Sequence, residues 1–520
     1  MFILITVGLL VLTALILVLL RLVTPESRYS WLVATGGALL GWISVVVWQA
    51  NMPIHLEFTI WKPASLFTQS PTFVADGVSW AYATAISALC LAIIVTSVVR
   101  ANFPSPLSWI GSLILTSLGI LAVTAGNPLT LVMIWAGIDL VELTIQLFFV
   151  EDPKLSERVV IAFASRVGGT ILVIWASMVG AANNQILDFH TGALQADLYL
   201  LIAAVFRLGV LPVHLPYPSE SAIRRGFGTG LRLVSAASSL VLLARIPAGT
   251  IQSPFIPYLT VFVALAALYG GWMWLRSSDE LSGRPYLLIG LGSLAVASAL
   301  RANPVGAAAW GCAMVLSGGA LFLSSEPNKW TIHSLWLAIF AISALPLSMT
   351  ATGWNTYGGS FILAGLPFIA AQAFMLAGFI RHIQKPAGSR AGFDGQPIWA
   401  RNIHPFGIAV LLITSIVLGF FGWEGSFQLG TWIAALPTAF LTFGLVWATP
   451  RFRILNPVRA HWVGPAESWF DRGYRVLWNS YHQLGRLSRV ITDILEGESG
   501  IMWTILFLAL FVSFFLQRAP

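Results

Sequence analysis

The stretch FILITVGLLVLTALILVLLR, residues 2–21, decides the fold class of this chain. No charged residue precedes Arg21 in it, and about 20 such residues in a helix cross the hydrocarbon core of a bilayer. The stretch is too long for the apolar core of a signal peptide, and it has neither a basic start nor an A-x-A-like cleavage site. We therefore interpret it as a membrane-spanning helix.

The remainder of the chain has the same character. Of its 520 residues 57% are hydrophobic and 9% are charged, whereas ordinary soluble domains contain roughly 25% charged residues. Apolar stretches of spanning length recur about sixteen times. They lie near 2–21, 31–50, 77–99, 107–125, 128–150, 159–180, 196–214, 227–246, 256–276, 285–301, 304–324, 332–353, 360–381, 403–423, 428–448 and 500–517. The predicted fold class is an all-α integral membrane protein.

The loops between these spans carry an alternating charge. Loops after spans 1, 3, 5, 7, 9, 13 and 15 contain arginine or lysine, whereas those after spans 2, 4, 6 and 14 contain almost none. The positive-inside rule then places the basic loops in the cytoplasm and both termini outside. The net charge of +7 reflects this orientation and not a nucleic-acid surface. We expect a bacterial cytoplasmic (inner) membrane protein that contacts lipid and no nucleic acid.

Cofactor chemistry finds no support in the sequence. Cys90 and Cys312 both fall inside spans, where small buried core residues are the expected reading. The eight histidines form no H-x-x-x-H pair, so neither a metal nor a cofactor site is predicted.

Segment 464–499 differs from the spans before it. Its apolar residues recur at three- and four-residue steps with arginines between them, which predicts an amphipathic helix on the cytoplasmic surface. Such a helix either rests in the lipid interface or braces neighbouring spans or a partner subunit.

Two carboxylates lie inside the fifth span, GNPLTLVMIWAGIDLVELTIQLF (126–148). Asp139 and Glu142 are three residues apart and so share one helix face. Charges within spans are costly and mark ion pathways. The two groups could share a proton, and the alternative is a structural ion pair with an intramembrane arginine.

The seventh span carries Arg207, followed by Pro212 and His214. Because proline removes a backbone hydrogen bond, this helix must break, and broken helices at membrane depth line cavities. The eighth span carries Arg232. Each arginine either belongs to an ion pathway or extends its charge to the interface.

A second interruption is predicted in LAIFAISALPLSMTATGW (337–354), which contains Pro346 and Gly353. Two interrupted helices in distant parts of one chain point to a transporter built from inverted repeats, with sites at the breaks.

Five stretches together resemble a known family. They are TFVADGVSWAYATAI (72–86), GNPLTLVMIWAGIDLVEL (126–143), AFASRVGG (162–169), RLGVLPVHLPYPSESA (207–222) and ISALPLSMTATGW (342–354). Their order and spacing resemble the antiporter-like subunits of respiratory complex I and of Mrp sodium/proton antiporters, most of all the long L-type subunit.

The resemblance implies a domain organisation with two inverted, antiporter-like repeats. The expected parts are N-terminal helices (1–106), a first repeat (107–250), a second repeat (251–400), C-terminal helices (401–450), the surface helix (451–499) and a final span (500–520).

The resemblance also implies a charged axis across the membrane centre. The family glutamate of the fifth span falls on Asp139, with Glu142 one turn away, and the family cations of spans 7 and 8 fall on Arg207 and Arg232. Arginine is in practice never deprotonated, so Arg207 is expected to act as a fixed electrostatic gate. The family aspartate of N-R-x-G-D falls on Gly169.

The second half departs further from the family. Residues 303–316 contain no Asp, Glu, His, Lys or Arg, and the lysine of span 12 falls near Asn355. The second repeat has therefore lost the family's relay groups.

Three functions follow from the resemblance and stay open here. The first is a proton-translocating or proton-gating subunit of a complex I-like, NADH dehydrogenase-like assembly that reduces quinone. The others are a membrane subunit of an inorganic-carbon uptake complex and a non-pumping scaffold. Each implies other membrane subunits as partners, and none gives this chain a catalytic centre of its own.

Overall fold

The computed structural model describes residues 2–24, 29–58, 70–99, 106–149, 153–183, 189, 194–213, 225–246, 253–324, 329–354, 362–384, 397–421, 429–451, 476, 479 and 483. Met1–Pro457 form one compact unit and Val458–Pro520 form a second. Three isolated helical residues of the second unit are described. The expected surface helix 464–499 and final span 500–517 therefore lie outside the described residues.

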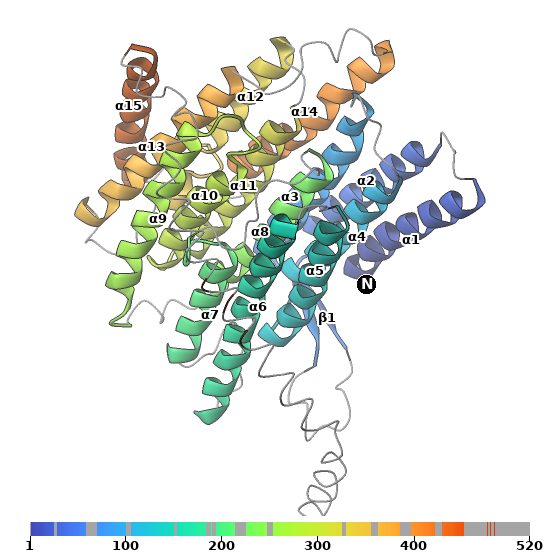
Figure 1. Cartoon of the computed structure of the whole chain (residues 1–520), viewed down its shortest axis with the longest axis horizontal. Coiled ribbons are helices and arrows are strands. Elements are labelled where there is room, and N and C mark those ends of the chain that lie inside the picture. Colours follow the sequence, from blue (N-terminus) through green and yellow to red (C-terminus); the bar gives the residue numbers. More distant parts are fainter. Residues whose placement is uncertain are drawn as a thin grey trace, which may run out of the picture. The chain divides into compact units, whose positions relative to one another are not determined.

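Fifteen α-helices form most of the described part of the first unit (Figure 1). They are α1 (Phe2–Val23), α2 (Ser30–Val47), α3 (Gly77–Thr96), α4 (Pro106–Val123), α5 (Pro128–Phe149), α6 (Pro153–Ala182), α7 (Leu194–Arg207), α8 (Phe227–Leu243), α9 (Ile256–Arg276), α10 (Arg284–Ala299), α11 (Pro304–Leu323), α12 (Lys329–Ala341), α13 (Ile362–Gln384), α14 (Ile398–Phe421) and α15 (Leu429–Arg451).

These helices confirm an all-α integral membrane protein. Eleven of the described helices are long and apolar enough to cross a membrane, and α8, α10 and α12 are shorter apolar helices. Each of the first fifteen expected spans corresponds to one helix, and the ends agree within two turns except where α7 and α12 stop early.

Helix α3 forms the centre of the first unit. It packs against α2, α4, α8, α11 and α14. The most apolar part of this helix, which is long enough to cross a membrane, is entirely buried. Alanines at 81, 83, 85, 88 and 92 let these neighbours approach closely. Asp76 caps its N-terminus by accepting a 2.8 Å hydrogen bond from the Ser79 amide.

The helices at the two sides of the bundle present apolar faces outward. Helices α1 and α2 lie at one side and α9, α13 and α15 at the other (Figure 1). Leu12 and Leu15 on α1, and Phe262 and Leu265 on α9, are each more than half exposed. Such faces suit contact with lipid.

A small antiparallel hairpin was not predicted from the sequence. Strand β1 (Ile54–Glu57) pairs with β2 (Thr72–Ala75), and Phe73 forms an isolated bridge with Ala125. The Asn127 amide donates to the Ser70 carbonyl at 2.8 Å. The hairpin thus fixes the turn that begins α5.

Two spans are interrupted. Helix α7 ends at Arg207. The turn that follows contains Gly209, with φ 65°, and Pro212. Helix α12 stops at Ala341, and Pro346 lies in the non-helical segment before a short 3-10 helix, η4 (Ala351–Trp354), which contains Gly353. These breaks explain why both helices are shorter than the expected spans.

Candidate functional site

Five charged side chains meet between four helices. Asp139 and Glu142 lie on α5, Arg166 on α6, Arg207 at the end of α7 and Arg232 on α8, and each side chain is at most 9% exposed. We call these five residues the charge cluster. Three arginines and two carboxylates give it a formal charge of 3 − 2 = +1.

The Arg207 guanidinium binds Asp139 with both of its terminal nitrogens. Nη1 donates to Oδ2 at 2.6 Å, and Nη2 donates to Oδ1 at 2.8 Å. Nη1 also donates to the Arg166 carbonyl at 3.0 Å and to the Thr170 hydroxyl at 3.1 Å, and Nε donates to the Ser239 hydroxyl at 3.3 Å. A two-pronged arginine–carboxylate pair fixes geometry as well as charge.

An aromatic ring and a glycine complete the surroundings of Arg207. Its guanidinium carbon lies 4.2 Å from the centre of the Trp135 ring, a favourable cation–π geometry. A Cβ added to Gly169 would lie 2.4 Å from Cγ of Arg207. The space that a side chain at position 169 would need is therefore filled by the arginine stem.

Glu142 receives three donors on one oxygen. Arg166 Nη1 donates to Oε1 at 2.6 Å, Gln146 Nε2 at 2.7 Å and Arg232 Nη1 at 3.0 Å. The other oxygen, Oε2, is buried and has no hydrogen-bond partner among the residues that the structure describes. The two carboxylates of the cluster are thus held in different ways.

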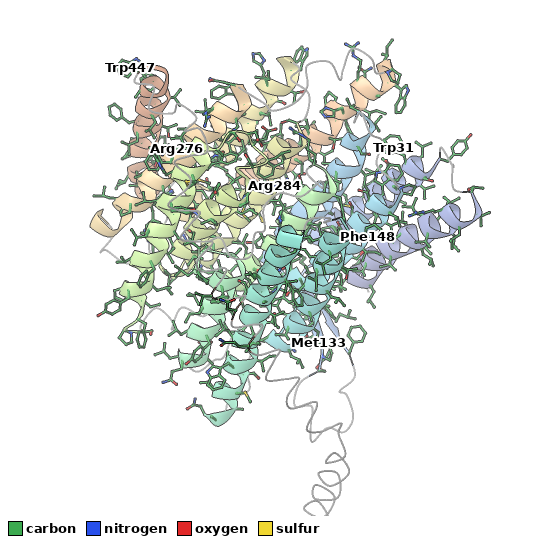
Figure 2. All side chains as sticks on the ribbon, in the orientation of Figure 1. Trp31, Met133, Phe148, Arg276, Arg284 and Trp447 are labelled. Atoms are coloured by element: carbon green, nitrogen blue, oxygen red, sulfur yellow. The ribbon has the colours of Figure 1, made fainter. Side chains whose placement is uncertain are left out.

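The outward face of α5 contrasts with this inward one. Met133 and Phe148, both labelled in Figure 2, are 39% and 79% exposed, and Leu140 between them is 61% exposed. Asp139 and Glu142 are 1% and 0% exposed. Helix α5 therefore separates lipid from charge.

The structure brings four of the predicted site residues together. Asp139, Glu142, Arg207 and Arg232 meet in the charge cluster, and each carboxylate bonds to arginine instead of to the other carboxylate. Both predicted arginines are buried, so neither extends to the interface. His214 lies outside the described residues. The other predicted residues lie elsewhere: Pro212 is in the turn after α7, and Pro346 and Gly353 are at the break after α12.

The sequence reasoning missed two members of this site. Arg166 bridges both carboxylates, with Nε 3.4 Å from Asp139 Oδ1 and Nη1 2.6 Å from Glu142 Oε1. Arg166 lies within the predicted span 159–180, so the rule that intramembrane charges mark function could have identified it from the sequence. Gln146 lies four residues after Glu142, hence on the same helix face.

A hydrogen-bond network of neutral groups holds the break of the second half. The Trp354 indole donates to the Gln372 side chain at 2.9 Å, and the Gln372 amide donates to the Ile342 carbonyl at 2.9 Å. The Arg301 guanidinium stacks 5.6 Å from the Trp354 ring centre. The described residues of this region therefore form a different kind of site from the charge cluster.

Metal binding has no support in the described part of the chain. No group of three His, Cys, Asp or Glu side chains is placed there to hold an ion. Arginine also outnumbers carboxylate in the charge cluster, which disfavours a further cation.

Comparison with known proteins gives similarity at the level of structure. No family model matches the sequence, and no curated protein matches it. A chain of the membrane-bound sulfane sulfur reductase, an archaeal respiratory membrane complex, is 12% identical with a TM-score of 0.70, over 98% of this chain and 100% of that one.

Two further solved structures have the same architecture. A chain of the Mrp complex from Dietzia sp. is 14% identical, with a TM-score of 0.67 over 100% of this chain and 63% of that one. A chain of respiratory complex I from Thermus thermophilus is 16% identical, with a TM-score of 0.60 over 85% of this chain and 100% of that one. The chain shares its fold with these chains of membrane complexes. The resemblance inferred from five short motifs is confirmed at the level of the fold, which positions the charge cluster beside a broken helix.

Proposed function

We propose that this chain is an ion-translocating subunit of a multi-subunit, complex I-like energy-coupling assembly, and that its charge cluster gates the passage of protons. The observation that carries the proposal is the meeting of five buried charges beside the break of α7. Buried charges within membrane spans are costly, and they are retained where ions move. The structural neighbours, which come from respiratory and Mrp complexes, support the same class of function.

The chemistry of the cluster favours a gate. Arginine cannot release its proton under physiological conditions, so the two carboxylates are the groups that can exchange one. With both carboxylates ionised, the net charge of +1 opposes the approach of a further proton. Passage therefore requires that a carboxylate be neutralised and that an arginine move.

The second half of the chain offers no comparable cluster of paired charges for a proton path among the described residues around its break. The break in the second half carries Trp354, Gln372 and Ile342 in a neutral hydrogen-bond network. We therefore assign proton gating to the first half of the chain.

A second candidate function is a non-pumping scaffold. It is favoured by the two-pronged pair of Arg207 and Asp139, because such a pair can serve assembly alone.

Purification of the intact assembly in mild detergent, followed by reconstitution into vesicles with an internal pH dye, tests the proposal. We expect quinone-reducing modules to copurify and the driving reaction to move protons. The charge-matched variant Glu142→Gln/Arg232→Gln should assemble but move none. A wild-type assembly that moves no protons would leave the scaffold, and copurification of a zinc hydratase would indicate inorganic-carbon uptake.

A further inference from the structure

We infer that Oε2 of Glu142 is the proton-accepting atom of the charge cluster, and that proton uptake there releases Arg232. This inference rests on the proposed function and deepens it. It moves the exchangeable proton from the position that matches the family glutamate, Asp139, to the carboxylate one turn farther along α5.

Both oxygens of Asp139 are occupied by guanidinium donors. Oδ2 accepts from Arg207 Nη1 at 2.6 Å, and Oδ1 accepts from Arg207 Nη2 at 2.8 Å. Arg166 Nε lies a further 3.4 Å from Oδ1. Protonation of either oxygen would neutralise the anion that both prongs of the Arg207 fork bind, so Asp139 is suited to hold the gate in place.

Glu142 is asymmetric. Oε1 accepts all three of its hydrogen bonds, from Arg166, Arg232 and Gln146. Oε2 has no donor among the described residues although the side chain is 1% exposed. A buried carboxylate oxygen without a donor is one that a proton can occupy without breaking an existing bond.

Gln146 extends this asymmetry along α5. Its amide nitrogen donates to Glu142 at 2.7 Å, while its own carbonyl oxygen is buried and without a partner in the described part of the chain. Glu142 Oε2 and the Gln146 carbonyl oxygen are thus two acceptors one helical turn apart. Protons or water molecules that reach this part of α5 satisfy both of them. Gln146 lies toward the C-terminal end of α5, and Lys154 and Arg158 just beyond that end predict that it faces the cytoplasm.

The step itself is a simple proton transfer. An O–H bond of a hydronium ion breaks as a new O–H bond forms at Oε2, and a water molecule remains. Glu142 becomes neutral, and the formal charge of the cluster rises from +1 to +2. The electrostatic attraction between Glu142 and the two arginines, Arg166 and Arg232, falls at the same time.

Arg232 is the arginine that leaves. It binds Glu142 at 3.0 Å with a side chain that is 9% exposed, whereas Arg166 binds at 2.6 Å and is 3% exposed. Arg166 also contacts Asp139, at 3.4 Å, and so keeps an anionic neighbour after Glu142 is neutralised.

Infrared difference spectroscopy of the reconstituted assembly, between its resting and energised states, tests this assignment. Wild type should show the C=O band of a newly protonated carboxylic acid. Asp139→Asn should keep the band, and Glu142→Gln should lose it together with about 100-fold of the proton transport rate. Loss of the band in Asp139→Asn, or its persistence in Glu142→Gln, would overturn the inference.

A second variant guards against misfolding. Glu142→Gln leaves two arginines facing a neutral amide, so Glu142→Gln/Arg232→Gln, which removes one of these charges, should assemble and still lack the band. Gln146→Leu should keep the band and slow its appearance. A wild-type assembly that transports no protons contradicts the proposed function. A wild-type assembly that transports protons, with the band unaltered in every variant, contradicts the inference alone.

Discussion

Arg207 depends on the shape of its guanidinium as much as on its charge. It holds Asp139 with two hydrogen bonds of 2.6 and 2.8 Å and lies against the Trp135 ring. We expect Arg207→Ala to lower the free energy of unfolding by about 3–5 kcal/mol, because it leaves a buried carboxylate poorly paired. Arg207→Lys restores the charge without the fork and should recover part of this loss. Thermal unfolding in detergent measures both, and equal stability of Lys and wild type would show that charge alone suffices.

Gly169 is required by the position of the Arg207 stem. A Cβ there would lie 2.4 Å from Arg207 Cγ and 3.1 Å from the Ala203 carbonyl oxygen. We expect Gly169→Ala to displace Arg207, with a loss of about 1–3 kcal/mol typical of overpacking. Gly168→Ala is the matched control, because its Cβ would lie 3.3 Å from the Phe206 ring and away from the cluster. Equal stability of the two variants would contradict this account.

Single residues of the site were predictable, but their pairing was not. Asp139, Glu142, Arg207 and Arg232 stand out because charges within spans are rare. Glu142 and Arg232 are 90 residues apart in sequence, and Arg207 and Asp139 are 68 apart. Which cation meets which carboxylate depends on how α5, α7 and α8 pack, and spacing along the chain does not contain that information.

Among the elements, the break after α12 depends in part on the hydroxyl of Thr350. Thr350 donates to the Ala341 carbonyl at 3.0 Å and accepts from the Ala344 amide at 3.1 Å. We expect Thr350→Val to destabilise the protein by about 1–3 kcal/mol, because the Ala344 amide stays buried without its acceptor. Thr352→Val is the control, since the buried Thr352 hydroxyl has no hydrogen-bond partner among the described residues. Thermal unfolding should separate the two, and a comparable loss in both would rule out this role.

The helices and their breaks could be predicted from the sequence, whereas the hairpin could not. Hydropathy over about 20 residues predicted α1 to α15, because lipid imposes length and polarity on each span. Pro212 and Pro346 predicted the two interruptions, because proline lacks the backbone donor. The hairpin was missed: its strands have four residues each, Ile54–Glu57 and Thr72–Ala75, and neither has the length or pattern to signal a strand by itself.

For the whole molecule, orientation in the membrane is the property that sequence predicts and that labelling can test. We expect Ser278→Cys, in the exposed loop after α9, to react with a membrane-impermeant thiol reagent only in opened cells. His55→Cys, exposed on β1, should react in intact cells. The native Cys90 and Cys312 are 2% and 0% exposed and should stay silent. Reaction of both sites from the same side would contradict the predicted orientation.

The central position of α3 has a consequence for how long the chain takes to assemble. Helix α3 and the short 3-10 helix after it end at Val99, yet one of the helices that bury them, α14, begins at Ile398. At roughly 5–20 residues per second, a ribosome needs on the order of 15–60 s to make the intervening chain. Throughout that interval Ala92, Val95 and Thr96, which lie against Gly407 of α14 in the folded chain, lack that cover. A chain cut short before α14 therefore leaves one face of its central helix uncovered, so the first helices made must wait for one of the last before their packing is complete.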